Sequence, residues 1–270
     1  MNKDLRHRLL VAVVGIPLCL FIFYTGGIYL QISLGLVALT GIWEYKKILF
    51  RHLLGLDLFD LAITSLIYLW ITCPQSRYCS GCLLPHWFYP AIVILVRSIL
   101  WYAFRPQKGL FKDYFLTFFG LIYCGIFTGY TFLISVNSPD NKLVLLLIIM
   151  IWIADSAAYF IGMKYGKHRG IIAISPNKSA EGFIAGLLAP FMISGGMLFW
   201  GKWSMAELMS VAFSAGCCGQ LGDLLESKLK RIGGVKDSSN LIPGHGGILD
   251  RFDSLLLAGP VLLLFLKYIR

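Results

Sequence analysis

The sequence predicts an all-α, polytopic integral membrane protein with about nine transmembrane helices and a cytoplasmic N-terminus. Of its 270 residues, 57% are hydrophobic and only 14% are charged, whereas a soluble domain has about 25% charged residues. The apolar residues form long runs, as crossing a hydrocarbon core of about 30 Å requires roughly 20 mostly apolar residues in a helix. The basic residues concentrate in alternate connections between these runs, and this pattern sets the orientation.

Nine apolar runs are candidate spans, at residues 9–25, 28–43, 59–73, 89–104, 115–136, 143–163, 183–200, 205–222 and 254–268. The first run is followed by no clear small-residue cleavage site, so we interpret it as a permanent anchor. The run 205–222 is rich in small residues, which let helices approach closely in a bilayer. We find no internal repeat, so the inverted-repeat signature of many transporters is absent from the sequence.

The distribution of basic residues supports this map. With the N-terminus in the cytoplasm, 18 of the 24 Lys and Arg residues fall in cytoplasmic segments, five fall outside and Arg97 lies within a span. The same map places the C-terminus outside. The net charge of +10 would suggest nucleic acid in a soluble protein, but here it indicates loops that set topology and face anionic membrane lipids. We therefore expect no nucleic-acid partner.

Two regions of different chemical character follow from the polar residues. Residues 1–142 form an N-terminal transmembrane region with few candidate site residues. Residues 143–270 form a C-terminal catalytic transmembrane region, which contains the longest polar stretches, 164–182 and 223–253. Both stretches are predicted to be cytoplasmic loops.

The stretch 223–253 has the composition of a nucleotide phosphate site. Carboxylate oxygens are the ligands that Mg²⁺ prefers and shares with substrate phosphates. Lys and Arg neutralise charge on phosphates, and glycines expose backbone N–H groups to them. A solvated loop whose charges only set topology is the alternative. The run Pro243-Gly-His-Gly-Gly247, followed by Asp250-Arg-Phe-Asp253, favours the phosphate site.

A second polar cluster lies upstream. Asp155 falls well inside an apolar span, where a carboxylate is costly and is a functional candidate by default. Tyr159 follows four residues later on the same helix face. In the run Ile174-Ser-Pro-Asn-Lys-Ser-Ala-Glu-Gly182, Ser179 is placed to cap a helix whose first turn holds Glu181. Such a helix start can bind phosphate, although a plain capped connection is the alternative.

The C-terminal motifs resemble the signature of the phosphatidate cytidylyltransferases, also called CDP-diglyceride synthetases. The resemblance rests on Ser227-Lys-Leu-Lys-Arg231, Lys236-Asp237, Pro243-Gly-His-Gly-Gly247 and Asp250-Arg251-Phe-Asp253. Upstream, Asp155, Tyr159, Gly162, Ser175-Pro-Asn-Lys178 and Glu181-Gly182 also resemble family motifs, as does Trp43-Glu44-Tyr45. The sequence departs from the family at Asn177-Lys178-Ser179, where Lys-Lys-Thr is more frequent, and the lost cation puts one phosphate contact in doubt.

The resemblance implies that CTP and phosphatidic acid react to give CDP-diacylglycerol and pyrophosphate in phospholipid biosynthesis. It implies a Mg²⁺-dependent enzyme with a second cation in a paired site, and we assign Asp223 and Asp250 as the metal ligands. The other catalytic candidates are Lys230, Arg231, Lys236 and Asp237. The substrate-binding candidates are Asp155, Tyr159, Ser175, Lys178, Glu181, Ser227, Lys228, His245, Gly246, Gly247, Arg251 and Asp253.

The implied setting is a bacterial inner membrane, with the active site on its cytoplasmic side; a homodimer is left open. Two other functions compete with this one. A CTP-dependent polyprenol or phytol kinase would transfer the γ-phosphoryl group to an alcohol, and a transporter would use Asp155 and Arg97 to line a path. A CDP-alcohol phosphotransferase is excluded, because the sequence contains no Asp-Gly-x-x-Ala-Arg run.

Overall fold

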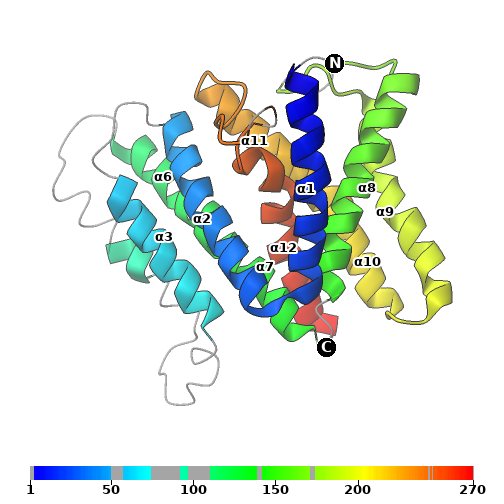
Figure 1. Ribbon diagram of the computed structural model, residues 1–270, viewed down its shortest axis with the longest axis horizontal. Coiled ribbons are helices and arrows are strands. Elements are labelled where there is room, and N and C mark those ends of the chain that lie inside the picture. The colour runs from blue at the N-terminus through cyan, green and yellow to red at the C-terminus, as the bar shows by residue number, and fades with distance from the viewer. Residues whose placement is uncertain are drawn as a thin grey trace.

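The computed structural model describes residues 3–49, 57–73, 92–96, 110–138, 142–170, 174–242, 244 and 246–269. Within these ranges the chain is mostly helical and forms no sheet, as predicted (Figure 1). Isolated β-bridges join Arg169 to Ser179 and Ile242 to Gly246. The all-α prediction is confirmed for this part of the chain.

The N-terminal region contributes α1 (Lys3–Thr25), α2 (Gly27–Leu49), α3 (Asp57–Thr72) and a long helix made of α6 (Leu110–Gly120), the π-helical turn η2 (Leu121–Ile126) and α7 (Phe127–Asn137). The C-terminal region begins with α8 (Lys142–Tyr165) and α9 (Ala180–Met197), which a 3₁₀ turn, η3 (Leu198–Trp200), follows. A second long helix joins α10 (Met205–Phe213), the π-helical turn η4 (Ser214–Gly219) and α11 (Gln220–Ile232), and α12 (Leu249–Ile269) ends the chain.

Six helices are long and apolar enough to cross a membrane: Gly27–Leu49, Phe115–Asn137, Lys142–Tyr165, Ala180–Met197, Met205–Ile232 and Leu249–Ile269. Two shorter apolar helices, Val11–Thr25 and Phe59–Thr72, coincide with the predicted first and third spans. Of the predicted span 89–104, only 92–96 are described, and they are helical. The protein is therefore a multi-pass membrane protein, and the total of nine spans stays a prediction.

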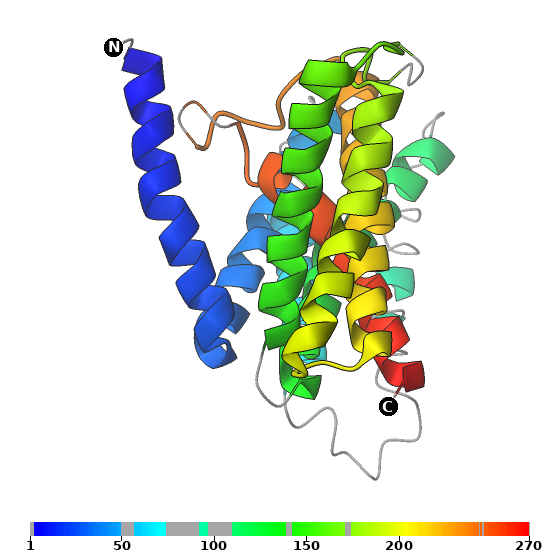
Figure 2. The same cartoon turned by 90° about the vertical axis from the view of Figure 1, so that its right-hand side faces the viewer.

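The polar connections of the C-terminal region lie at one end of the helices. Figures 1 and 2 show the N-terminus at the same end as the α8–α9 connection and the α11–α12 loop, and the C-terminus at the opposite end. We call these the site end and the far end. The basic-residue map also assigns the first three to one side and the C-terminus to the other, and which side faces the cytoplasm stays a prediction.

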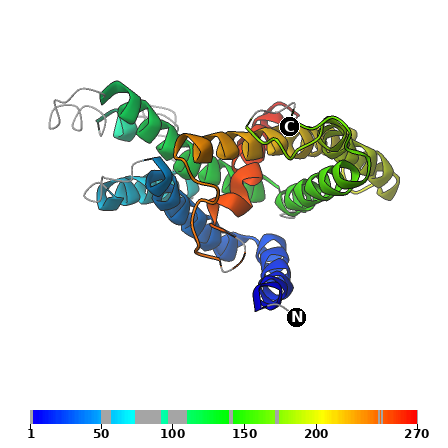
Figure 3. The same cartoon turned by 90° about the horizontal axis from the view of Figure 1, so that it is seen from above.

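Helix α12 is central to the bundle. It packs against α2, α7, α8, α10 and α11, and Figure 3 shows it enclosed between α2 and α11. Helix α1 contacts α2 and α8 and leaves Val13, Val14 and Phe21 more than half exposed. Exposed apolar side chains on a membrane-spanning helix face lipid, so α1 forms part of the outer surface of the bundle.

The structure corrects the extent of the predicted loop 223–253. Helix α11 continues to Ile232 and α12 begins at Leu249, so the loop covers only 233–248. The continuous helix Met205–Ile232 has 28 residues and is about 42 Å long. It is longer than a hydrocarbon core of about 30 Å, so its polar C-terminal end can extend beyond the apolar layer. Gly233 and Gly234, the latter with φ of 66°, then end the helix.

Small residues pack the C-terminal helices closely, as predicted. A side chain on Gly216 would meet the carbonyl oxygen of Leu187 at 2.7 Å, and one on Gly222 would meet that of Asp253 at 2.5 Å. These approaches hold α9 against η4 and α11 against α12. The second approach places Asp223, the next residue, beside the first turn of α12.

Candidate active site

A cavity of about 480 Å³ opens between α8, α9 and α11 at the site end. Its polar lining includes Asp155 on α8, Arg169 and Lys178 in the α8–α9 connection, and Asp223 on α11. Its apolar lining includes Tyr159, Met163 and Phe183. The cavity therefore joins a charged surface to an apolar one within a single space.

Glycines shape the wall of this cavity. A side chain on Gly182 would lie 2.6 Å from the carbonyl oxygen of Ala158, and one on Gly186 would lie 2.9 Å from that of Ala154. Helix α9 starts at this contact, where the Ser179 side chain accepts a hydrogen bond from the Gly182 N–H at 3.2 Å. The predicted cap and first turn are confirmed.

Lys178 and Asp223 form an ion pair that joins the α8–α9 connection to α11 across 45 residues of sequence. The Ser227 hydroxyl, one turn along α11, lies 3.4 Å from the other Asp223 oxygen. Asp155 interacts electrostatically with Asp223 and Lys178 and also with Arg251. The structure therefore brings together these predicted residues from four separate segments.

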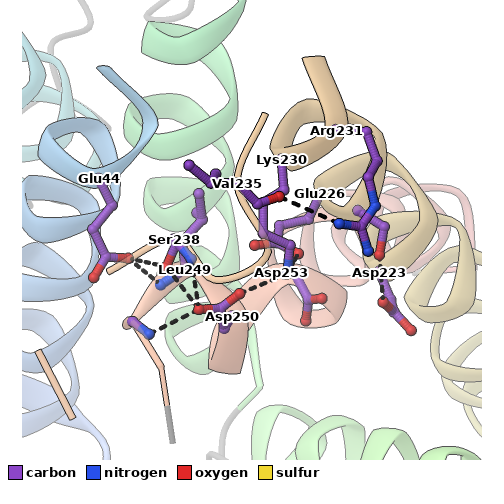
Figure 4. A network of polar contacts seen from close by, with 12 residues as sticks. Glu44, Asp223, Glu226, Lys230, Arg231, Val235, Ser238, Leu249, Asp250 and Asp253 are labelled. Atoms are coloured by element: carbon purple, nitrogen blue, oxygen red, sulfur yellow. Dashed lines mark hydrogen bonds and ion pairs between the residues drawn. The ribbon is translucent and has the colours of Figure 1, made fainter. Parts of the chain in front are cut away.

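A second cluster surrounds Asp250, in the first turn of α12 (Figure 4). One oxygen of Asp250 accepts from Lys230 at 2.6 Å. The other accepts from the Ser238 N–H and the Gly247 N–H at 3.0 and 2.8 Å, and the Ser238 hydroxyl oxygen lies 2.9 Å from it. Lys230 also pairs with Glu226 at 2.5 Å. Asp250 is thus held by one cation and by the loop that precedes it.

Asp253 connects the two clusters. It is buried, and it interacts electrostatically with Asp223, Asp155 and Lys230. In the view of Figure 4 its carboxylate lies between those of Asp223 and Asp250. The predicted metal ligands Asp223 and Asp250 therefore belong to neighbouring clusters along the α11–α12 contact.

The remaining candidates lie at the edges of these clusters or elsewhere. Lys228, Arg231, Lys236, Asp237 and Arg251 are exposed, and Arg231 donates to the Val235 carbonyl at 3.4 Å. The Ser175 carbonyl accepts from the Lys178 N–H at 3.1 Å within the connection. Gly246 has a φ of 82°, which favours glycine. His245 lies outside the described residues.

Glu181 and Tyr159 have distinct placements. The Glu181 carboxylate contacts the ring of His168 at 2.6 Å and accepts from the His168 N–H at 3.2 Å. These contacts fasten the α8–α9 connection to the start of α9. Tyr159 lines the cavity with 63% of its surface exposed.

Two buried carboxylates were not among the site residues predicted from the sequence. Glu226 is 1% exposed and pairs with Lys230, and its position three residues after Asp223 and four before Lys230 could have indicated it. Glu44 is fully buried at the end of α2 and contacts the 233–248 loop. In the sequence, Glu44 was noted only as part of Trp43-Glu44-Tyr45, a tripeptide that resembles a family motif.

The donor chemistry of the site suits Mg²⁺. Within the described ranges no group of three or more His, Cys, Asp and Glu side chains lies close enough to hold a metal ion by itself. Mg²⁺ is usually bound through one or two carboxylates, with phosphate oxygens and water completing the shell. The carboxylates along the α11–α12 contact fit such a site, in which the substrate supplies the remaining ligands.

The fold and the site define a multi-pass membrane protein with a charged, carboxylate-rich site at one end of its helices. The chain belongs to the cytidylyltransferase family, whose model matches residues 6–269. It is 32% identical over 263 residues to the phosphatidate cytidylyltransferase of Staphylococcus aureus (strain COL), covering 96% of this chain and 97% of that protein. Proteins of the same name from Staphylococcus haemolyticus and Staphylococcus saprophyticus are 32% and 31% identical, with the same coverage of both chains.

Proposed function

We propose that the protein is a phosphatidate cytidylyltransferase, which converts CTP and phosphatidic acid to CDP-diacylglycerol and pyrophosphate in phospholipid biosynthesis. The proposal follows from full-length similarity to relatives of that name. The structural observation that carries it is the cavity, where a lysine and two carboxylates lie beside an apolar lining. A lipid phosphate requires this combination.

The cavity suggests where phosphatidic acid binds. Its phosphate would lie near Lys178, which pairs with Asp223, and near Arg169, the other cation in the cavity lining. Its acyl chains would leave along Met163 and Phe183, apolar residues that line the same space. Apolar chains in this direction stay in contact with the surrounding lipid, so the substrate need not leave the membrane.

The reaction requires charge neutralisation and alignment more than a strong base. A phosphate oxygen of the lipid forms a bond to the α-phosphorus of CTP, and the bond from that phosphorus to the β-phosphate oxygen breaks to release pyrophosphate. The attacking phosphate is already an anion at neutral pH. The barrier therefore arises mainly from repulsion between anions and from orientation.

Cations around the site are placed to reduce that repulsion. Lys178 and Lys230 each neutralise a carboxylate, Asp223 and Asp250 respectively, and each can turn to a phosphate. Lys228, Arg231 and Lys236 are exposed around the loop, where the triphosphate of CTP can reach them from water. We assign them to phosphate binding.

We propose that Asp223 and Asp250 hold Mg²⁺, with Asp253 between them as a further oxygen donor and with room for a second cation. The bound ion would supply charge neutralisation to the phosphate oxygens. We also propose that the site faces the cytoplasm, because 18 of the 24 Lys and Arg residues then lie on that side.

The direct test uses the purified protein in detergent with CTP, phosphatidic acid and Mg²⁺, and identifies the products by mass. We expect CDP-diacylglycerol and pyrophosphate, loss of turnover with EDTA and recovery with excess Mg²⁺. Release of CDP with phosphorylation of a lipid alcohol would identify a kinase instead. Full turnover in excess chelator would disprove the metal assignment alone.

A further inference from the structure

The end of helix α2 is hydrogen-bonded to the loop that precedes α12. Glu44 is fully buried there, and its carboxylate accepts four hydrogen bonds from residues about 200 positions later in the sequence. The donors are the hydroxyls of Ser238 and Ser239, at 2.9 and 2.5 Å, and the N–H groups of Ile248 and Leu249, at 3.0 and 2.7 Å. One side chain thus fixes both ends of the segment 238–249.

Two of these bonds cap α12. The first N–H groups of a helix have no partner within it, and a carboxylate near them is favoured by the helix dipole. Glu44 meets this need at Ile248 and Leu249. The cap comes from another helix, so it sets the position of the start of α12 relative to α2.

Ser238 links Glu44 to Asp250. Its hydroxyl oxygen lies 2.9 Å from a Glu44 oxygen and 2.9 Å from an Asp250 oxygen, while its N–H donates to the same Asp250 oxygen at 3.0 Å. A hydroxyl has one proton and donates it to one carboxylate at a time. When the hydroxyl donates to Glu44, the N–H still donates to Asp250, so Ser238 connects the two carboxylates (Figure 4).

The packing around this link leaves little freedom. A side chain on Gly247 would lie 2.4 Å from a Glu44 oxygen and 2.0 Å from the Ser238 hydroxyl. A side chain on Gly233, at the end of α11, would lie 2.4 Å from the carbonyl oxygen of Ile48. The end of α2 therefore contacts the end of α11 as well as the loop.

We propose that Glu44 is a positioning residue for the reaction, which acts by holding Asp250 in place through Ser238 and through the cap on α12. The proposal rests on the proposed function, because it assigns Asp250 to the active site. It also gives the N-terminal transmembrane region a part in catalysis. Glu44 touches no substrate in this scheme, and its effect passes through the loop.

The first test replaces Glu44 by Gln, which keeps the size and one acceptor oxygen but replaces the other oxygen by an NH₂ group that faces donors. We expect turnover per folded enzyme to fall by about 10- to 100-fold in protein that stays monodisperse in detergent. The matched control is Asp60→Asn. Asp60, on α3, is also buried and pairs with Lys46 on α2, the helix that carries Glu44, but both residues of this pair lie outside the loop.

The control separates positioning from stability. Asp60→Asn should lower the thermal midpoint and leave turnover per folded enzyme near that of the wild type. If Glu44→Gln behaves in the same way, with a lower midpoint and normal turnover, the positioning role is wrong. If Glu44→Gln cannot be purified as a folded protein, the serine variants below decide the question.

The second test compares Ser238→Ala with Ser239→Ala. Each removes one hydrogen bond to Glu44, but only the Ser238 hydroxyl also reaches Asp250 among the contacts of the described residues. We expect Ser238→Ala to reduce turnover several-fold more than Ser239→Ala at similar thermal midpoints. Equal losses would overturn the link through Ser238.

A double variant completes the experiment. If Glu44 acts through Ser238, Glu44→Gln with Ser238→Ala should be little slower than Glu44→Gln alone, because residues acting as one unit are non-additive. Multiplication of the two single effects would contradict the proposal. Absence of cytidylyl transfer by the wild-type protein would instead contradict the proposed function, so the two failures are distinguishable.

Discussion

The site end and the far end of the C-terminal helices are built from the same elements and differ in how their polar residues are connected. At the site end, polar contacts join distant segments: Lys178 to Asp223, Lys230 to Asp250 and Ser238 to Glu44. At the far end, the α9–α10 connection is closed by a local capping box between Ser204 and Glu207. In the C-terminal helices, long-range polar contacts therefore gather at the candidate site, whereas the far end is closed by a local cap.

The difference has a physical basis. A local cap satisfies helix N–H groups without constraining other elements. A buried pair between distant segments is costly to form unless both charges are compensated, and it fixes the relative position of the segments that contribute it. Four experiments test this difference between the two ends, in order of decreasing expected effect.

The carboxylates of the site end should dominate activity. Asp223→Asn or Asp250→Asn keeps the size of the side chain and removes the charge that a hard cation needs. We expect turnover to fall by a factor of about 1,000 or more in each, and the double variant to be little worse than either. Turnover is measured on protein that inserts and purifies normally.

The far-end control for these variants is Glu207→Gln, which should retain near-normal turnover. Asp57→Asn, in the N-terminal region, should do the same. If Asp250→Asn keeps most of its activity in well-folded protein, the metal assignment is wrong and the loop is structural.

Lys178 should matter more than any far-end lysine. Lys178→Ala leaves Asp223 without its ion-pair partner and removes the cation proposed for the lipid phosphate. We expect roughly a 100-fold loss of kcat/KM for phosphatidic acid, and the measurement is initial rate against lipid mole fraction in mixed micelles. Lys202→Ala, an exposed lysine of the far end, is the matched control. Equal rates for both variants would remove Lys178 from the site.

Two glycines of α9 should differ in their tolerance of a side chain, because Gly182 is closely packed and Gly195 is not. Gly182→Ala places a methyl group 2.6 Å from the Ala158 carbonyl oxygen, so α8 and α9 must separate beside the cavity. Overpacking of this kind costs about 1–3 kcal/mol, and we expect both the thermal midpoint and turnover to fall. Gly195→Ala meets nothing within 4 Å and should change neither. A normal Gly182→Ala enzyme would show that the cavity wall tolerates expansion.

The smallest effect should come from the far-end cap. Ser204→Ala removes the side chain that accepts from the Glu207 N–H at 3.2 Å. Loss of such a cap costs about 1 kcal/mol of stability, and turnover should stay near the wild-type value. Thermal unfolding in detergent, followed alongside activity, measures both quantities. A large loss of turnover would mean that the far end is coupled to the site.

The fold class and most of the membrane map could be predicted from the sequence. Runs of apolar residues identify spanning helices because the bilayer leaves the backbone no other partner than its own helix. Eight of the nine predicted spans coincide with helices in the described residues. The motifs around Lys178, Asp223 and Asp250 also indicated the candidate site, because carboxylates, cations and glycines together have the composition of a nucleotide phosphate site.

Which of these residues contact one another depends on the packing of the helices and could not be predicted from the sequence. The apolar run 205–222 ends before Asp223, so hydropathy predicted the end of the helix there. Helix α11 continues to Ile232, because it packs against α12. The pairing of Asp223 with Lys178, and the separate cluster of Asp250 with Lys230, depends on how α8, α9, α11 and α12 pack. Glu44 is the strongest case, since its partners lie about 200 residues away. Local sequence patterns do not show which residues so far apart in the sequence come into contact. The packing of α2 against the loop brings Glu44 to its partners.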